Sequence, residues 1–299
     1  MMQRLLGILL RLLARMPWGV LRGIGRLAGE VMYRLGGRET RNVRANLAIA
    51  YPHMAPERRE QLVRDSLVQS AMNYAEMPRI WLAGEDLSYR VDANGLPETM
   101  RRLVERGNGL ILAMPHHGNW EMVSSAVDRS LHITGLYRPP RQPWLEPLMT
   151  EGRSVARIDM VPTSRSGIKA LYQALQDGNV VAILPDQVPK ALGAAAAVAA
   201  PFFGRDCSTM VLLGRLASRH RSPVLFVWAQ RQPDGRYRME YFEAEEAIAD
   251  RDPLIAASAL NRAVERCVGP RLPSTNGPIG ASTRYSPDRA IPIVDCLVI

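Results

Sequence analysis

The stretch that decides the fold is Gly109-Leu110-Ile111-Leu112-Ala113-Met114-Pro115-His116-His117-Gly118-Asn119-Trp120-Glu121. Its apolar first half is typical of a short buried strand. Asn119 before Trp120 and Glu121 is typical of a helix start, with the Asn119 side chain capping free backbone N–H groups. A strand that runs through a turn into a helix places polar side chains at the rim of a sheet, where open α/β folds bind ligands. We therefore expect a functional site at this turn.

Strand–turn–helix units continue on both sides of this stretch, behind a helical region at 38–82. Strands are predicted at Gly109–Met114, Ile133–Leu136, Val180–Leu184, Val224–Ala229 and, as an edge strand, Tyr237–Phe242; helices are predicted near 121–129, 144–156, 166–177, 208–220 and 260–268. The alanine-rich segment Ala194–Ala200 is predicted to be a loop or short helix. The pattern as a whole indicates an α/β sandwich.

Positive charge is concentrated at the N-terminus. Residues 1–50 contain nine arginines and two glutamates, which gives +7 of the total net charge of +9. The body is therefore close to neutral, which argues against a nucleic-acid-binding domain. The three cysteines, Cys207, Cys267 and Cys296, have neither metal nor disulfide spacing, so reduced thiols and no metal site are expected.

Residues 1–33 combine an apolar run with a basic stripe. The stripe consists of Arg4, Arg11, Arg15, Arg22 and Arg26. On one continuous helix these arginines fall in a narrow sector, and no acidic residue precedes Glu30. This pattern favours a helix that lies in a membrane interface, with Pro17 kinking it or splitting it in two. A single transmembrane anchor and a soluble helix packed on the body are the alternatives.

His116 and Glu121 are the residues expected to carry chemistry. They can meet if His116 lies in the turn and Glu121 in the first turn of the following helix. A carboxylate that bonds a histidine fixes its tautomer and makes it a better base toward a hydroxyl. No serine or cysteine nucleophile lies between them, so direct attack by an activated hydroxyl on an acyl group is predicted. The alternatives are a purely structural turn and, more weakly, a metal site.

The sequence resembles the bacterial lipid A biosynthesis acyltransferases, of the lauroyl/myristoyl type, within the lysophospholipid acyltransferase superfamily. The resemblance covers residues 1–268. It is carried by Pro115–Glu121 with its histidine and glutamate, Leu136-Tyr137-Arg138-Pro139, Leu184-Pro185-Asp186-Gln187, and Pro201-Phe202-Phe203-Gly204. It implies three regions: a membrane-associating helix (1–33), an αβα acyltransferase domain (34–268) and an atypical tail (269–299).

The resemblance also implies roles for individual residues. His116 and Glu121 would be catalytic; Tyr137, Arg138, Asn119 and Asp186 would contact substrate, although Asp186 reads equally well as a turn residue; Phe202 and Phe203 would line the acyl pocket. The implied reaction, which needs no cofactor, moves a fatty acyl chain from acyl-carrier protein, or acyl-CoA, to a hydroxyl of a lipid A precursor. The implied location is the cytoplasmic face of the inner membrane. Another glycolipid or lysophospholipid acceptor, and a catalytically impaired membrane-binding protein, are the rival interpretations.

The tail departs from the family pattern, which continues with a Gln-Tyr-x-Trp block. Codons permitted for Pro273–Thr283, read two bases along, encode Gln-Tyr-Gln-Trp-Ala-Tyr-Arg-Arg-Phe-His. We therefore hypothesise a frameshift near Val268–Gly269, which resequencing of the locus would test.

Overall fold

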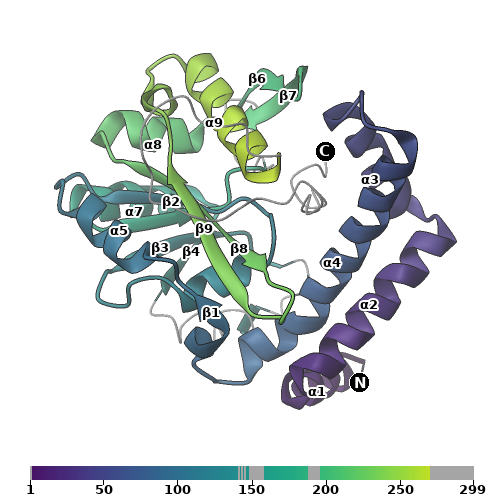
Figure 1. Ribbon diagram of the computed structural model, residues 1–299. Coiled ribbons are helices and arrows are strands. Elements are labelled where there is room, and N and C mark those ends of the chain that lie inside the picture. The colour runs from purple at the N-terminus through teal and green to yellow at the C-terminus, as the bar shows by residue number, and fades with distance from the viewer. Residues whose placement is uncertain are drawn as a thin grey trace.

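In the computed structural model, which describes residues 2–140, 142, 144, 146–147, 158–187 and 196–269, a seven-stranded, mostly parallel sheet forms the centre of the molecule (Figure 1). Its strands are β1 (Val91–Asp92), β2 (Leu110–Ala113), β3 (Ile133–Tyr137), β4 (Ile158–Pro162), β5 (Val180–Ile183), β8 (Val224–Arg231) and β9 (Tyr237–Glu243). They lie in the order β1-β9-β8-β2-β5-β3-β4, and among them β8 and β9 pair antiparallel. The predicted α/β class is confirmed.

Helices flank this sheet and also form a separate layer at the N-terminus. They are α1 (Met2–Arg15), α2 (Trp18–Leu35), α3 (Arg38–Ala50), α4 (Pro56–Leu82), α5 (Leu96–Val104), α7 (Arg165–Gln176), α8 (Leu212–His220) and α9 (Pro253–Val268), with 3₁₀ helices at Leu87–Arg90, Trp120–Ser125 and Glu246–Ala249. A separate hairpin pairs β6 (Ala197–Phe202) with β7 (Arg205–Met210).

Alternation along the strands produces two cores, one on each face of the sheet. On β2, Leu110 and Leu112 join the core that contains α5 and the 3₁₀ helix Trp120–Ser125. Ile111 and Ala113 of the same strand face the other core, with α7, α8 and α9. Neighbouring side chains of a strand point to opposite faces, and both faces here are covered, so the strand reads as a continuous apolar run.

The N-terminal helices pack on the body through α4. Pro17 splits the segment into α1 and α2, which is one of the two predicted outcomes, the other being a kink in one helix. Gly25 and Gly29 face α4 so closely that a Cβ on them would lie 2.5 Å from the Met72 Cα and 2.4 Å from the Val68 Cα. Small residues thus let the two helix backbones approach, and Figure 1 shows α2 and α4 side by side.

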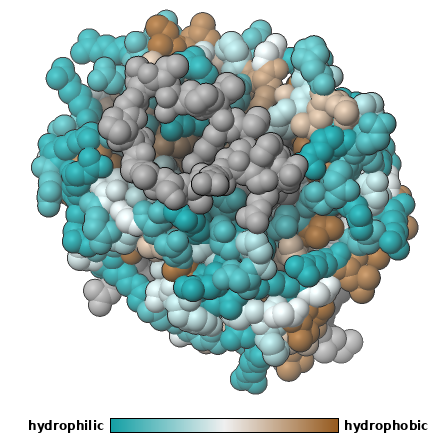
Figure 2. Space-filling model, viewed as in Figure 1, coloured by the Kyte–Doolittle hydropathy of each residue, from teal (hydrophilic) through white to brown (hydrophobic). Residues whose placement is uncertain are grey.

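The outer face of α1 and α2 carries apolar side chains on the surface. It includes Leu6, Ile8, Leu9, Leu12, Val20, Ile24, Leu27, Val31 and Leu35, all of them exposed. Figure 2 shows hydrophobic surface interleaved with polar surface on the lower right of the molecule, where Figure 1 places these helices. Among the described helices, none has both the length and the apolarity needed to cross a bilayer.

The structure corrects several element predictions. Ala197–Ala200 belong to strand β6, and the helix expected at 208–220 begins only at Leu212 because β7 occupies the residues before it. The hairpin forms because Phe203 and Gly204 adopt positive φ values of 48° and 73°, which reverse the chain. The helix expected at 121–129 is a shorter 3₁₀ helix, Trp120–Ser125. Tyr237–Phe242 is predicted as an edge strand, but β9 pairs on its outer side with the two-residue strand β1.

Two predictions lie outside the part of the chain just described. The helix near 144–156 falls almost entirely there, and so does the tail from residue 270 onward, with the frameshift hypothesis.

Candidate active site

The polar residues of the predicted motifs follow the carboxyl ends of three adjacent strands. β5 lies between β2 and β3 and is parallel to both. His116 follows β2, Arg138 follows β3, and Asp186 and Gln187 follow β5. Parallel strands end at the same edge of a sheet, so segments 70 residues apart in sequence meet at one site.

Asp186 holds His116 at two points. The Asp186 Oδ2 atom accepts a hydrogen bond from the His116 backbone N–H at 2.8 Å, and its Oδ1 atom lies 2.9 Å from the ring Nδ1. The Asp186 side chain is 2% exposed, whereas the His116 ring is 18% exposed and lines a pocket. An Nδ1–H donated to the carboxylate leaves the lone pair on Nε2, which is the form that accepts a proton.

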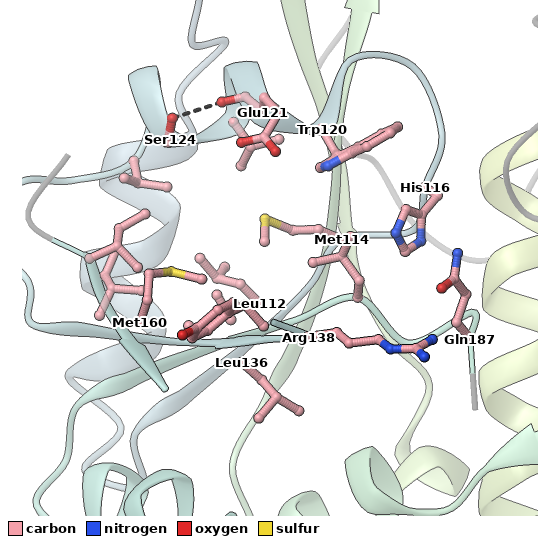
Figure 3. Close-up of a pocket in the computed structure, with 18 of the residues that line it drawn as sticks. Leu112, Met114, His116, Trp120, Glu121, Ser124, Leu136, Arg138, Met160 and Gln187 are labelled. Atoms are coloured by element: carbon pink, nitrogen blue, oxygen red, sulfur yellow. Dashed lines mark hydrogen bonds between the residues drawn. The ribbon is translucent and has the colours of Figure 1, made fainter. Parts of the chain in front are cut away.

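Glu121 lies in the first turn of the 3₁₀ helix, as predicted, and it lines the same pocket. It is buried, and its backbone carbonyl accepts a hydrogen bond from Ser124 Oγ at 2.7 Å. In Figure 3 the Trp120 ring lies between the Glu121 and His116 side chains. Trp120 contacts the His116 ring edge-on, with the centroids 5.0 Å apart. The sequence predicts that Glu121 bonds His116, whereas the carboxylate at 2.9 Å from the His116 Nδ1 atom is that of Asp186.

The Pro115–Glu121 turn is held in place by β8. Gly118 has φ +65°, and a Cβ on it would lie 2.2 Å from the Ala229 carbonyl oxygen, so only glycine fits without displacement. The next backbone N–H, of Asn119, donates to the same Ala229 oxygen at 3.2 Å. The Gly118 carbonyl accepts a hydrogen bond from Asn73 Nδ2 at 2.7 Å.

Asn119 corrects a prediction, because its side chain makes no helix-capping hydrogen bond. It is buried, and its Nδ2 atom donates to Glu76 Oε2 at 3.2 Å and to the Tyr237 hydroxyl at 3.1 Å. Its charge-assisted hydrogen bond to the buried Glu76 carboxylate orients the Asn119 amide toward Glu76. Asn119 also does not belong to the lining of the pocket.

Glu76 is the centre of a buried polar cluster that ties the turn to α2, α4, β8 and β9. Its Oε1 atom accepts from Arg231 Nη1 at 2.6 Å and from Arg22 Nε at 2.8 Å, and its Oε2 atom accepts a short hydrogen bond from the Tyr237 hydroxyl. Arg231 also donates to Asn73 at 2.8 Å. Arg22 is thus turned into the body, and it leaves the exposed basic stripe expected from a continuous helix.

The charges in this cluster compensate one another. Burial alone would raise the pKa of the Glu76 carboxyl, but Arg231, with Tyr237 and Arg22, outweighs burial and lowers that pKa below its usual value. Burial also raises the pKa of the Tyr237 hydroxyl, so it stays protonated and donates to Glu76. The carboxylate therefore remains charged and paired next to the Pro115–Glu121 turn.

The pocket beside His116 has a volume of about 410 Å³. Its apolar lining includes Leu112, Met114, Val123, Val127, Ile133, Leu136, Ile158 and Met160, with Met77 and Trp81 of α4. Among its polar members, His116, Arg138 and Gln187 lie together at one end in Figure 3, and Glu121 and Ser124 lie away from them. A cavity with a histidine at one end and a hydrocarbon surface behind it suits a long apolar chain with a reactive head.

The remaining predicted residues are distributed differently. Tyr137 and Arg138 line the pocket, and the Tyr137 hydroxyl donates to Glu146 at 2.5 Å. Phe202 and Phe203 are not part of its lining; their rings contact each other edge-on in the β6–β7 hairpin, and the Phe203 N–H donates to Glu265 of α9 at 2.5 Å. The apolar lining is instead supplied largely by β2, β3, β4, α4 and the 3₁₀ helix Trp120–Ser125.

Comparison with known proteins agrees with this geometry. Residues 2–273 match the family described as bacterial lipid A biosynthesis acyltransferase. The chain belongs to this family. It is 26% identical over 257 residues to a lipid A biosynthesis acyltransferase of Haemophilus influenzae, covering 84% of this chain and 80% of the relative. It is also 24% identical over 258 residues to the lipid A biosynthesis palmitoleoyltransferase of Escherichia coli, covering 84% and 81%. The protein is therefore an acyltransferase.

Sequence reasoning missed Glu76, Arg231 and Asn73, which hold the turn of this acyltransferase. Their side chains come from a long helix and a strand, where charged and amide residues ordinarily face solvent. The sequence indicates Glu76 only through its mostly apolar neighbours on α4, which include Ala75 and Met77. Arg231 is the last residue of β8 and carries no such signal.

Proposed function

We propose that this acyltransferase moves a fatty acyl chain from an acyl-carrier-protein thioester to a hydroxyl of a lipid A precursor. The observation that carries the proposal is the His116–Asp186 pair at the polar end of an apolar cavity. The family membership and the names of the relatives, which are lipid A biosynthesis enzymes, support the same acceptor class.

In the proposed mechanism His116 is the general base. Its Nε2 removes the proton of the acceptor hydroxyl, and the oxygen attacks the thioester carbonyl carbon. The C–O bond forms, the C–S bond breaks, and the imidazolium returns its proton to the leaving thiolate. Asp186 keeps the ring in the tautomer that this step needs and stabilises the imidazolium. Glu121 is proposed as a second catalytic carboxylate, because it lines the same cavity as His116.

Arg138 is proposed to bind the acceptor. It is exposed, lines the pocket, and lies at the same end as His116 (Figure 3). A guanidinium fork matches the oxygens of a phosphate, which lipid A precursors carry next to their acylated sugars. Arg138→Ala is therefore expected to raise KM for the phosphorylated acceptor more than it lowers kcat.

We also infer that α1 and α2 hold the enzyme on the anionic surface of the membrane. Their outer face combines exposed apolar side chains with Arg11, Arg15 and Arg26, all exposed. Apolar residues at the interface and arginines at the headgroups are the two contributions that retain a peripheral helix pair. The same positive charge would attract an acidic carrier protein.

The deciding experiment is a transfer assay with purified protein, labelled acyl-carrier protein and separate lipid acceptors. Acceptors should include a lipid A precursor, another glycolipid and a lysophospholipid, with products identified by mass spectrometry. We expect acylation of the lipid A precursor and its loss in His116→Ala, while circular dichroism and the unfolding temperature of the variant stay unchanged. Acylation of another acceptor alone would overturn the assignment of substrate. Vesicle binding without any transfer would support the impaired-enzyme alternative.

A further inference from the structure

The cavity is hollowed by two small residues on neighbouring strands. In the register of the sheet, Leu112 of β2 is opposite Ala182 of β5, Ala182 is opposite Gly135 of β3, and Gly135 is opposite Met160 of β4. Residues in register on parallel strands point to the same face, and all four line the cavity. The row is thus large, small, small, large, and the space lies above its centre.

Gly135 has no side chain, and this leaves the space above the centre of the row open. A Cβ built at Gly135 would lie 2.9 Å from Met160 Sδ and 3.1 Å from Ile158 Cγ2. Both distances are shorter than ordinary van der Waals contacts, so an added Cβ would displace the Met160 side chain. Met160 is flexible and half-buried on the outer strand, so it can yield without breaking the sheet.

The position of this row relative to His116 gives it a role. His116, Arg138 and Gln187 lie at one end of the cavity, and Met160 lies toward the opposite end (Figure 3). One step further from the catalytic edge, the register places the larger Ile133 of β3 opposite Ile158 of β4. An acyl chain whose carbonyl carbon is at His116 would therefore pass over Ala182 and Gly135 and end against Ile158 and Met160.

We propose that Gly135 and Ala182, with Met160 and Ile158 as the end wall, determine the length of the acyl chain that the enzyme transfers. The inference rests on the proposed function of the His116 site and adds the residues that select its donor. The physical basis is that each methylene buried in the cavity adds to the stabilisation of the reacting complex. A methylene that meets an enlarged wall loses that contribution.

The test measures kcat/KM with a graded series of saturated acyl thioesters, from medium to long chains, for the wild type and four variants. Gly135→Ala, Gly135→Val and Ala182→Val are expected to shift the optimum to shorter chains, with about a fourfold loss for each methylene excluded. Met160→Ala is expected to shift the optimum to longer chains. The two directions together distinguish a length limit from general damage.

The matched control is Gly37→Val, at a position with φ −63° where an added Cβ meets no atom within 4 Å. It adds the same groups outside the cavity and should leave the chain-length profile unchanged. The profile is a ratio between donors, so it is independent of the folded fraction of each variant. Active variants with an unchanged profile would overturn the length assignment, whereas a wild type that transfers no acyl chain of any length would overturn the proposed function itself.

Discussion

His116 Nδ1 lies 2.9 Å from Asp186 Oδ1, and the backbone N–H of the same histidine donates to the other oxygen of that carboxylate at 2.8 Å. One buried side chain therefore fixes both the main chain and the ring of the residue proposed as the base. His116 follows β2 and Asp186 follows β5, so their pairing depends on the order of the strands in the sheet. It also gives Asp186 a specific role in the proposed mechanism.

The first prediction concerns Asp186→Asn. An asparagine can accept from the His116 N–H, but its amide group would donate to Nδ1 and favour the tautomer with a proton on Nε2. That tautomer cannot act as the base, so kcat should fall by about 10²-fold or more while KM and the unfolding temperature change little. Steady-state kinetics and thermal unfolding provide the measurement. Undiminished kcat would rule out the orienting role of Asp186.

Glu121→Gln provides the companion measurement. If Glu121 acts in the cavity, its loss should lower kcat, and the double variant Asp186→Asn/Glu121→Gln should be less active than either single variant. If one carboxylate alone supports the base, the double variant should match the more damaging single change. Glu121→Gln with wild-type kcat would refute the catalytic role proposed for this residue.

The second prediction separates steric conflict from backbone strain at the catalytic turn. In Gly118→Ala the new Cβ meets the Ala229 carbonyl, and the residue must also hold φ +65°. In Gly36→Ala the φ value is +61°, but the Cβ meets no atom within 4 Å. We expect Gly36→Ala to cost about 1 kcal/mol of stability with normal kcat. Gly118→Ala should cost more and lower kcat sharply, and equal kinetics of the two variants would contradict this.

The third prediction is a loss of stability in acid that depends on Glu76. Its pKa is lowered in the folded protein, so the folded state binds fewer protons than the unfolded state near the usual value of 4.5. The stabilisation is then complete above that value and is lost as the pH falls through the lower folded pKa. Denaturant unfolding followed from about pH 7 to pH 3 should show a steeper acid loss for the wild type than for Glu76→Gln.

The matched change for this cluster is Arg231→Met, which removes the cation and leaves Glu76 buried beside Arg22. Removal of one partner of a buried pair costs roughly 3–5 kcal/mol, because the remaining charge loses its compensation. The Arg231→Met variant should therefore be clearly less stable than the wild type at neutral pH. An Arg231→Met variant as stable as the wild type would show that Arg22 alone compensates the carboxylate.

Much of the fold was predictable because its strands are short apolar runs bounded by turns. Leu110–Ala113 and Val180–Ile183 are buried on both faces and are found almost where the sequence predicts them. The β6–β7 hairpin was not predictable in this way, since Ala197–Ala200 contain only one β-branched residue, Val198, and are otherwise alanine. The alanines are accepted there because they pack under α9, whose Asn261 donates to the Pro201 carbonyl at 2.9 Å.

The candidate site shows the same division. The turn and its histidine follow from local sequence, because strand, turn and helix start are adjacent in the chain. The partner of the histidine depends on β5 lying between β2 and β3, which no local pattern specifies. The proposed limit on acyl-chain length likewise depends on register, because Gly135 and Ala182 lie side by side only through the pairing of β3 with β5.

The last prediction concerns the exposed face of α2. Leu27, 67% exposed, and Ile24, 44% exposed, lie on the outer face of the helix, away from the glycines that pack against α4. The double variant Ile24→Glu/Leu27→Glu should keep its unfolding temperature but bind vesicles with anionic headgroups at least tenfold more weakly, since it loses apolar contact and adds negative charge. The control is Leu254→Glu, a comparably exposed leucine on α9, distant from α2 in Figure 1. Vesicle sedimentation gives the measurement, and equal binding of both variants would show that another surface meets the membrane.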